Sequence, residues 1–323
     1  MLVIFLVVAG FFLIWNWPVS EKNDSMLFGV SFSNVFAREM GLDWKQVYVV
    51  MLDDLKPKRI RLAAYWTEIE KQKGQYDFSD LDWQLDEARK RKVPVILAFG
   101  IKAPRWPECH IPEFYKQDKQ QREDALLQYE DVLIQRYKEY DNIRVWQVEN
   151  EPFLDFGDCI DGAVDAALVD REIAAVKKYD KLRPVMVTDS GELSLWYQAA
   201  KRGDMFGSTL YRNIYKEPIG YFTYPIGPNF FRMKAELIRL FAFQENMIIA
   251  ELQAEPWGPK SIQQMTVAEQ YQSMNPQIFE EIVQYTKKTN FLEAYFWGVE
   301  WWYWLKENQN DAAMWESARK VLK

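Results

Sequence analysis

The stretch IRVWQVENEP, residues 143–152, joins a short apolar run to a cluster of polar side chains. Its first half has the length and character of a buried β-strand. Glu149, Asn150 and Glu151 follow at once, so two carboxyl groups and one amide stand where the strand should end. A buried strand that runs directly into such groups indicates that its end carries chemistry.

The chain repeats this arrangement along most of its length. Apolar runs predict eight strands, at residues 27–32, 59–66, 93–100, 143–150, 184–189, 205–211, 247–252 and 293–300. Helical patterns alternate with them at residues 43–56, 79–92, 123–140, 165–180, 193–203, 231–243, 275–289 and 311–322, and Ser79 and Asp82 have the spacing of a capping box.

Eight strands that are each followed by a helix are typical of a (β/α)8 barrel, the TIM barrel fold. We expect this domain to span residues 25–323. The alternative is an open, doubly wound α/β sheet. No strand is followed by a GxGxxG or GxxxxGK[ST] sequence, so the usual ligand signature of that fold is missing.

Composition limits the function classes. The 323 residues are 49% hydrophobic and 27% charged, enough for one large core, and the net charge of −7 gives no basic surface for nucleic acid. The chain has 14 Trp, 17 Tyr and 20 Phe. These aromatic residues fit either a bulky core or a cleft that stacks on flat apolar faces, as sugars present.

The N-terminal segment is strongly apolar. Residues 2–15 carry no charge, and Trp15 and Trp17 close the run. We expect residues 1–20 to be a transmembrane anchor or a signal segment. Neither a basic start nor a small-residue cleavage site is present, which favours an uncleaved anchor over a removed signal, and a buried first element of the domain is a third alternative. The domain would then lie outside the cytoplasm, anchored or secreted.

In a TIM barrel the chemistry lies at the carboxyl ends of the strands. Polar and aromatic side chains gather at these ends. Strand four ends in Asn150 and Glu151, and strand seven, in AELQAEPW at 250–257, supplies Glu251. The other strands add Arg61, Trp66, Tyr211, Trp257 and Trp297.

The NEP sequence at 150–152 and AELQAEPW at 250–257 resemble the motifs of the clan A glycoside hydrolases, retaining TIM-barrel enzymes that include the cellulase-like family 5 and families 39 and 42. The resemblance covers the chain after residue 25. It implies that Glu151 is the general acid/base, that Glu251 is the nucleophile, and that Asn150 binds the sugar 2-hydroxyl. It also implies that Arg61 and Tyr211 hold Glu251, and that Trp297 is a platform for the sugar.

In that mechanism two carboxyl groups about 5–5.5 Å apart cleave the bond with retention of configuration. We expect Glu251 to be ionised beside Arg61 and Tyr211, and the pKa of Glu151 to be raised by burial and by the charge of Glu251. The substrate would be a β-linked oligo- or polysaccharide. The resemblance implies no cofactor or metal, and we expect a monomer. A barrel that binds carbohydrate without cleaving it is the alternative.

Other residues near the strand ends are ambiguous. Glu149, Glu255 and Glu300 are expected to support the site without taking part in the reaction. Tryptophans at positions 66, 106, 146, 257, 301 and 302 could line sugar subsites or pack between barrel and helices, and we assign Trp66 and Trp257 to the substrate. The single histidine, His110, is expected to be a loop residue.

The chain has two cysteines, Cys109 after strand three and Cys159 after strand four. In a barrel the loops that follow these strands are neighbours. We therefore predict a disulfide between them, which an exported domain permits, with two free thiols as the alternative.

Overall fold

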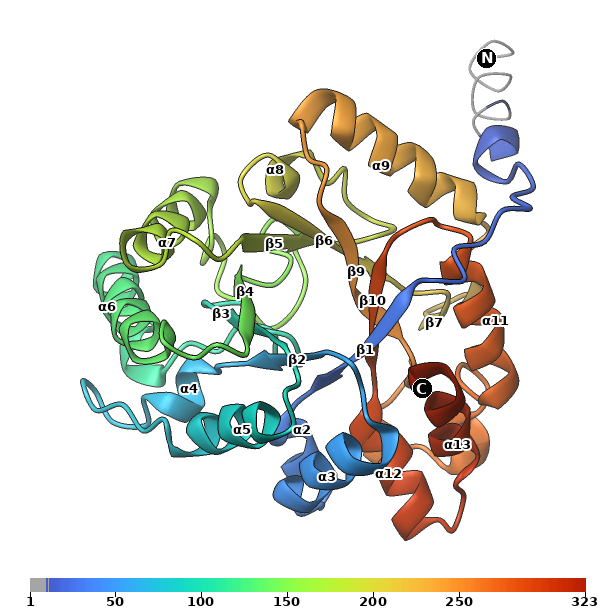
Figure 1. Ribbon diagram of the computed structural model, residues 1–323, viewed down its shortest axis with the longest axis horizontal. Helices are drawn as coiled ribbons and strands as arrows, with labels where there is room; N and C mark the ends of the chain where they lie inside the picture. The colour runs from blue at the N-terminus through green and yellow to red at the C-terminus, as the bar shows by residue number, and fades with distance from the viewer. Residues whose placement is uncertain (1–9, 11) are drawn as a thin grey trace.

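The computed structural model describes residues 10 and 12–323. Its centre is a closed barrel of eight parallel strands in the order β1, β10, β9, β6, β5, β4, β3, β2 (Figure 1). The barrel strands are β1 (Leu27–Phe32), β2 (Ile60–Ala63), β3 (Val95–Phe99), β4 (Ile143–Val148), β5 (Val185–Asp189), β6 (Met205–Leu210), β9 (Met247–Gln253) and β10 (Glu293–Trp297). The predicted TIM barrel is confirmed.

Helices surround the barrel. The longer ones are α3 (Trp44–Val50, continued by a π-helical turn at Met51–Leu55), α5 (Ser79–Lys90), α6 (Lys119–Tyr137), α7 (Ala166–Tyr179), α9 (Pro228–Ala242), α11 (Pro276–Lys287), α12 (Val299–Asn308) and α13 (Ala313–Leu322). Short helices are α2 (Asn34–Glu39), α4 (Trp66–Ile69), α8 (Tyr197–Ala200) and α10 (Val267–Gln270). The large core lies between helices and barrel, and a smaller cluster around Ile96, Met186 and Tyr295 fills the barrel.

The structure differs from the sequence predictions at several places. The strand predicted at 293–300 ends at Trp297, because Gly298 has a φ of +130° and turns the chain into α12. A Cβ at this position would lie 2.7 Å from the Cβ of Glu255, so glycine is required there. The helix predicted at 193–203 is reduced to α8. The capping box at Ser79 is wrong, because Asp77 accepts the amide hydrogen of Ser79 and Phe78 is the N-cap.

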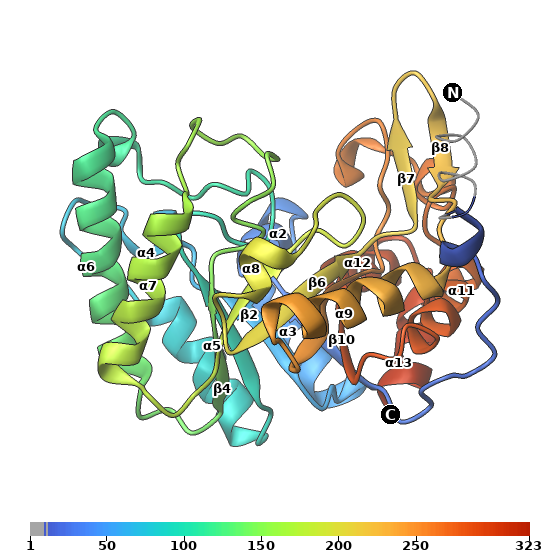
Figure 2. The ribbon, with the colours of Figure 1, turned by 90° about the horizontal axis from the view of Figure 1, so that it is seen from above.

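One predicted loop region is a β-hairpin. Between β6 and α9 the chain forms β7 (Asn213–Lys216) and β8 (Gly220–Thr223), an antiparallel pair that extends from the barrel (Figure 2). The alternating side chains of NIYK and the Pro218 and Gly220 turn residues were the available sequence signals.

Half of the predicted N-terminal membrane segment, residues 1–20, lies outside the described residues. Within residues 10 and 12–323, no helix combines the length and the apolar character needed to cross a membrane.

Candidate active site

A cavity of about 500 Å³ opens at the carboxyl ends of the strands. Both predicted catalytic acids, Glu151 and Glu251, line it. Its walls are rich in aromatic side chains, namely Trp106, Phe156, Tyr211, Tyr215, Tyr224, Trp257 and Trp297. Residues distant in the sequence therefore form one cleft, lined by both candidate acids and by several aromatic rings.

Glu251, on β9, is held at both carboxylate oxygens. Arg61 on β2 donates from Nη1 to Oε2 at 3.0 Å, and the hydroxyl of Tyr211, which follows β6, donates to Oε1. Arg61 is almost fully buried, so water screens its ion pair with Glu251 only weakly. The contacts that the resemblance implied for Arg61 and Tyr211 are both present.

The same arginine connects Glu251 to the end of β4. Arg61 donates from Nη2 to Oδ1 of Asn150 at 2.7 Å and from Nε to Oε1 of Gln147 at 2.8 Å. Both acceptors are buried. The guanidinium thus fixes the nucleophile candidate and the residue next to the acid candidate relative to each other.

Glu151 lies in the cleft with a buried carboxyl group. Its backbone has a φ of +48°, and its amide donates to Oγ1 of Thr188 at 3.0 Å, which fixes the turn. Oγ1 of Thr209 donates to Oε1 of Glu151 at 3.2 Å. Burial raises the pKa of Glu151 well above its usual range, and the negative charges of Glu251 and Glu108 raise it further. This shift favours the protonated form of Glu151, which is able to donate a proton.

The predicted aromatic residues divide into two groups. Trp257 and Trp297 line the cleft, and the ring of Trp257 meets that of Tyr211 edge to face at 5.4 Å. The assignment of Trp66 to the substrate is wrong: it is fully buried, bonded to Glu70 and stacked on Tyr115 and Tyr129. The chain turns into α4 at Trp66, which directs the ring between barrel and helices.

Trp146, Trp301 and Trp302 are also fully buried in the core. Trp106 is exposed at the rim of the cleft, 6.4 Å from Phe156 between ring centres. Of the six tryptophans that were ambiguous in the sequence, the structure places Trp106 and Trp257 at the cleft and the other four in the core.

Glu149 is fully buried and accepts the amide hydrogens of Ile101 at 2.8 Å and Lys102 at 2.6 Å. It thereby links the end of β4 to the loop after β3. Lys102 in turn donates to the carbonyl oxygen of Glu151 at 3.0 Å. Glu149 thus helps to position the acid candidate Glu151 and takes no part in the reaction itself.

Glu255 and Glu300 bind one arginine. Arg105 donates to Glu255 at 2.5 and 2.8 Å and to Glu300 at 3.1 Å. The guanidinium lies 4.1 Å from the ring centre of Trp297 and covers that ring. The two acids thus fix a cation against the predicted sugar platform.

His110 is a structural residue. It is buried, its Nε2 lies 3.2 Å from the carbonyl oxygen of Arg105, and its ring packs against Tyr65. Burial lowers the pKa of His110 to about 4, so the ring is neutral.

Sequence reasoning missed two carboxyl groups of the cleft, those of Glu108 and Glu192. Glu108, in the loop after β3, lines the cavity and accepts a hydrogen bond from Nδ2 of Asn150 at 3.3 Å. Its neighbours Pro107 and Cys109 marked a constrained loop, but no motif singled out the carboxyl group. The threonines that contact Glu151 and the aromatic residues of the hairpin were missed as well.

The predicted disulfide is confirmed. Cys109 and Cys159 are bonded, with their Cα atoms 5.2 Å apart. The bond joins the loop after β3 to the loop after β4 and so ties the segment that carries Glu108 to the one that follows Glu151.

Three buried carboxyl groups lie behind the cleft. Glu149, Glu172 on α7 and Glu130 on α6 are fully buried, and the carboxyl group of Glu172 interacts with those of both Glu149 and Glu130. No donor in the described part of the chain reaches the carboxyl oxygens of Glu130 or Glu172, so a hydrogen bond between two of these carboxyl groups requires that one of them holds a proton. Burial raises the pKa of Glu130 to about 8.

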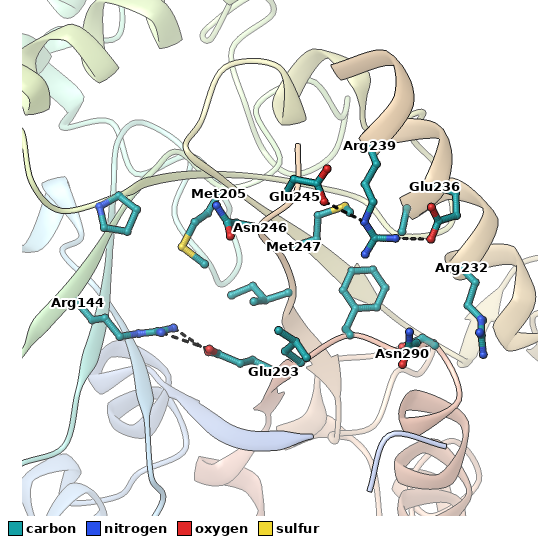
Figure 3. A pocket seen from close by; sticks show the side chains of 16 residues that line it. Arg144, Met205, Arg232, Glu236, Arg239, Glu245, Asn246, Met247, Asn290 and Glu293 are labelled. Carbon is teal, nitrogen blue, oxygen red and sulfur yellow. Dashed lines mark hydrogen bonds and ion pairs between the residues drawn. The ribbon is translucent and has the colours of Figure 1, made fainter. Parts of the chain in front are cut away.

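A second cavity, of about 380 Å³, lies at the opposite end of the barrel, where the strands begin (Figure 3). Its charged groups are paired, with Arg144 bound to Glu293 and Arg239 to Glu236 and Glu245. The carboxyl end of a TIM barrel carries the chemistry, so the cleft around Glu151 and Glu251 is the candidate site. Among residues 10 and 12–323, no group of His, Cys, Asp or Glu has the arrangement of a metal site.

Comparison with known proteins establishes the fold. No family model and no curated protein sequence matches the chain. A solved β-galactosidase from the Antarctic haloarchaeon Halorubrum lacusprofundi has a TM-score of 0.57 and 13% identity, with 84% of this chain and 52% of that chain covered. An endoglucanase from Pseudomonas stutzeri has a TM-score of 0.57 and 14% identity, with 95% and 97% covered.

A β-glucosidase from Exiguobacterium marinum has a TM-score of 0.56 and 11% identity, with 86% of this chain and 90% of that chain covered. The chain thus spans about half the length of the β-galactosidase and nearly all of the endoglucanase. At these identities the likeness is one of fold: the chain has the barrel that these glycoside hydrolases share.

Proposed function

We propose that the chain is a retaining glycoside hydrolase that cleaves β-linked oligo- or polysaccharides through a covalent glycosyl-enzyme intermediate. One observation carries the proposal. A buried acid with a raised pKa, Glu151, shares a cleft with a carboxylate, Glu251, that an arginine and a tyrosine hold in place. Two carboxyl groups in such different surroundings suit the division of labour that glycoside cleavage needs.

In the first step Glu251 attacks the anomeric carbon, and the bond from that carbon to the leaving oxygen breaks. Glu151 gives its proton to this oxygen, and the sugar is now bonded to Glu251. In the second step Glu151, now ionised, takes a proton from water, which attacks the anomeric carbon and releases Glu251. Two displacements restore the original configuration.

The walls of the cleft suit a carbohydrate. Trp257 offers apolar ring surface to a sugar, and Trp297 lines the same cleft with Arg105 over its ring. Asn150 lies next to Glu151, where its amide can bind the substituent on the carbon beside the bond being cleaved. We therefore propose that the chain acts as a monomer on a carbohydrate substrate and uses no cofactor. We propose no nucleic acid as a partner.

Proton NMR of the reaction tests the mechanism. A chromogenic β-glycoside that the wild type cleaves is followed from the first turnover, before the released sugar mutarotates. The expected first product is the β-anomer. If the α-anomer forms first, Glu251 is not the nucleophile. If no β-glycoside or glycan is cleaved while sugars still bind, the barrel is a binding protein.

The disulfide indicates an oxidising compartment outside the cytoplasm, and we further propose that the N-terminal segment holds the domain at a membrane. Exposed apolar side chains support this proposal. Four exposed large apolar side chains lie in residues 12–17, three in 193–197 and four in 237–243. Together these segments hold more than half of the large apolar side chains exposed in the described residues.

The three segments lie along α9. Asn229 in the first turn of α9 donates to the carbonyl oxygen of Ile14 at 2.8 Å, and α8 packs beside α9 (Figure 1). The inner face of α9 buries Phe231, Ala235 and Ile238. Its outer face exposes Leu237, Leu240 and Phe241 to solvent, in the position expected of a surface that rests on lipid.

A further inference from the structure

Glu108 is a carboxyl group without a cation. It lines the cleft with Glu151 and Glu251, and Nδ2 of Asn150 donates to its Oε2 at 3.3 Å. None of the ion pairs formed by the described residues includes Glu108. Burial, followed by the negative charge of Glu251, raises the pKa of Glu108 to about 7.

The nearby cations are already engaged. Arg61 binds Glu251, Asn150 and Gln147. The ammonium group of Lys102 donates to two backbone carbonyl oxygens, of Glu151 at 3.0 Å and of Leu154 at 2.8 Å. The carboxyl groups of Glu151, Glu192, Glu251 and Glu255 line the same cleft, and the charge of Glu108 has no direct partner in the described part of the chain.

The backbone holds Glu108 in an unfavourable conformation. Its φ is +72°, in the left-handed region that side chains with a Cβ rarely adopt. Its amide donates to the carbonyl oxygen of Arg105 at 2.7 Å, and its own carbonyl accepts from Ala103 at 2.9 Å. A Cβ on Gly157 would lie 2.6 Å from the Cβ of Glu108, so the facing loop packs directly against it. These contacts hold the carboxyl group of Glu108 at the cleft.

The chemistry of the sugar identifies what Glu108 would face. The anomeric carbon must lie between Glu151 and Glu251, and its ring neighbours are the ring oxygen, which is only an acceptor, and C2, which carries a hydroxyl or an amino group. Glu108 and Asn150 lie beside these two acids. A carboxylate repels the lone pairs of the ring oxygen and attracts a donor, so the C2 substituent is the group that faces Glu108.

We infer that Glu108 is a specificity-determining residue that binds a protonated amino group at C2 of the sugar, so that the preferred substrates are β-linked 2-amino sugars. This inference rests on the proposed hydrolase function. A C2 hydroxyl would supply a hydrogen bond but leave the carboxylate charge unpaired, whereas an ammonium group supplies both. An acetamido group carries no positive charge and places a bulky acyl group against the carboxylate.

The test compares para-nitrophenyl β-glycosides that differ only at C2. The free-amino, hydroxyl and acetamido forms are measured in the gluco, galacto and manno series, for the wild type and for Glu108→Gln. In the series that the wild type cleaves best, kcat/KM should be about tenfold or more higher for the amine than for the hydroxyl form. Glu108→Gln should lower kcat/KM for the amine about 10- to 100-fold, because it removes the charge from a hydrogen bond between two charged groups. For the hydroxyl form the change should stay below about threefold.

Glu113→Gln is the matched control, because Glu113 lies in the same loop but is exposed and outside the cleft. It should keep the wild-type ratio of amine to hydroxyl activity. Equal loss on both substrates in Glu108→Gln, or a wild-type preference for the hydroxyl form, would overturn the inference and leave the hydrolase proposal intact.

Calorimetry separates the two proposals further and does not depend on turnover. Free glucosamine, galactosamine and mannosamine should bind the wild type more tightly than glucose, galactose and mannose, and the difference should vanish in Glu108→Gln. If no glycoside is cleaved but this difference is found, the hydrolase proposal is wrong and the role of Glu108 stands. If neutral and amino sugars bind equally well or not at all, the role of Glu108 is wrong. Thermal unfolding of Glu108→Gln close to that of the wild type shows that these readings come from folded protein.

Discussion

Arg61 and Glu251 form a buried ion pair of 3.0 Å although 190 positions separate them in the chain. The pair joins β2 to β9 across the mouth of the barrel, and the same guanidinium reaches Asn150 at the end of β4. One side chain therefore positions the proposed nucleophile and the neighbour of the proposed acid. The site depends on the closure of the barrel, since no two of these residues belong to adjacent strands.

Replacing the nucleophile should abolish turnover. Glu251→Ala removes the carboxylate that Arg61 and Tyr211 hold, and we expect it to lose nearly all activity. Azide fits the vacated space and should restore part of the rate, giving a glycosyl azide of inverted configuration. Product NMR identifies it. Glu245→Ala, at the opposite end of the barrel, is the control, and a retained azide product would contradict the assignment.

Replacing the acid should produce a different pattern. Glu151→Ala should slow substrates with poor leaving groups by about 10²–10⁴-fold, because protonation of the leaving oxygen is lost. Substrates with good leaving groups should still form the covalent intermediate, and azide should then give a product of retained configuration. A series of aryl glycosides with graded leaving groups measures this dependence. Equal loss across the series would show that Glu151 is not the acid.

The alkaline side of the pH profile should report Glu151. Burial and the charges of Glu251 and Glu108 raise the pKa of Glu151, and activity should fall as pH rises through it because the proton is lost. Glu108→Gln removes one of these charges and lowers the pKa of Glu151. Its alkaline limb of kcat/KM, measured with an uncharged glycoside, should therefore move to lower pH. Glu113→Gln should leave the limb where it is, and a shift to higher pH in Glu108→Gln would contradict the role of Glu151.

Folding stability should fall as pH rises. The pKa of Glu130 is about 8 in the folded chain, whereas it is about 4.3 in an unfolded chain, so between these values the folded state holds a proton that the unfolded state has lost. Glu130→Gln removes this titration and should raise the free energy of unfolding at pH 8 by about 1–3 kcal/mol, with little gain at pH 4. Chemical denaturation at both pH values measures it, with the exposed Glu139→Gln as control. Equal effects at both pH values would rule out shared protons.

If the N-terminal segment is an anchor, the full chain should fractionate with membranes. A shortened chain that begins at Asn23 should be active and should bind anionic phospholipid vesicles only weakly. In the shortened chain, replacing Leu240 and Phe241 by Asp removes two apolar groups from the outer face of α9 and should weaken vesicle binding about tenfold or more. Leu182→Asp, exposed outside the three apolar segments, should have little effect. A native protein that begins near Ser20 would show that the segment is removed and the anchor proposal is wrong.

Local patterns in the sequence were sufficient for the barrel. The spacing of apolar residues fixes the strands and helices, and their alternation leaves few ways to close a sheet of parallel strands. Because the carboxyl ends of these strands share one face, Glu151, Glu251, Arg61 and Tyr211 could be brought together before any coordinates were known. The disulfide between Cys109 and Cys159 followed from the same adjacency of loops.

Only the tertiary structure decided which way the loop side chains point. Trp66 and Trp257 both follow strands, yet Trp66 enters a helix and is buried, whereas Trp257 faces the cleft. Glu108 carries no sequence signal, because its place beside Asn150 depends on a left-handed backbone and on the packing of Gly157 from another loop. Strand periodicity is local and survives in the sequence, but the direction of a loop side chain results from contacts between segments that the sequence keeps far apart.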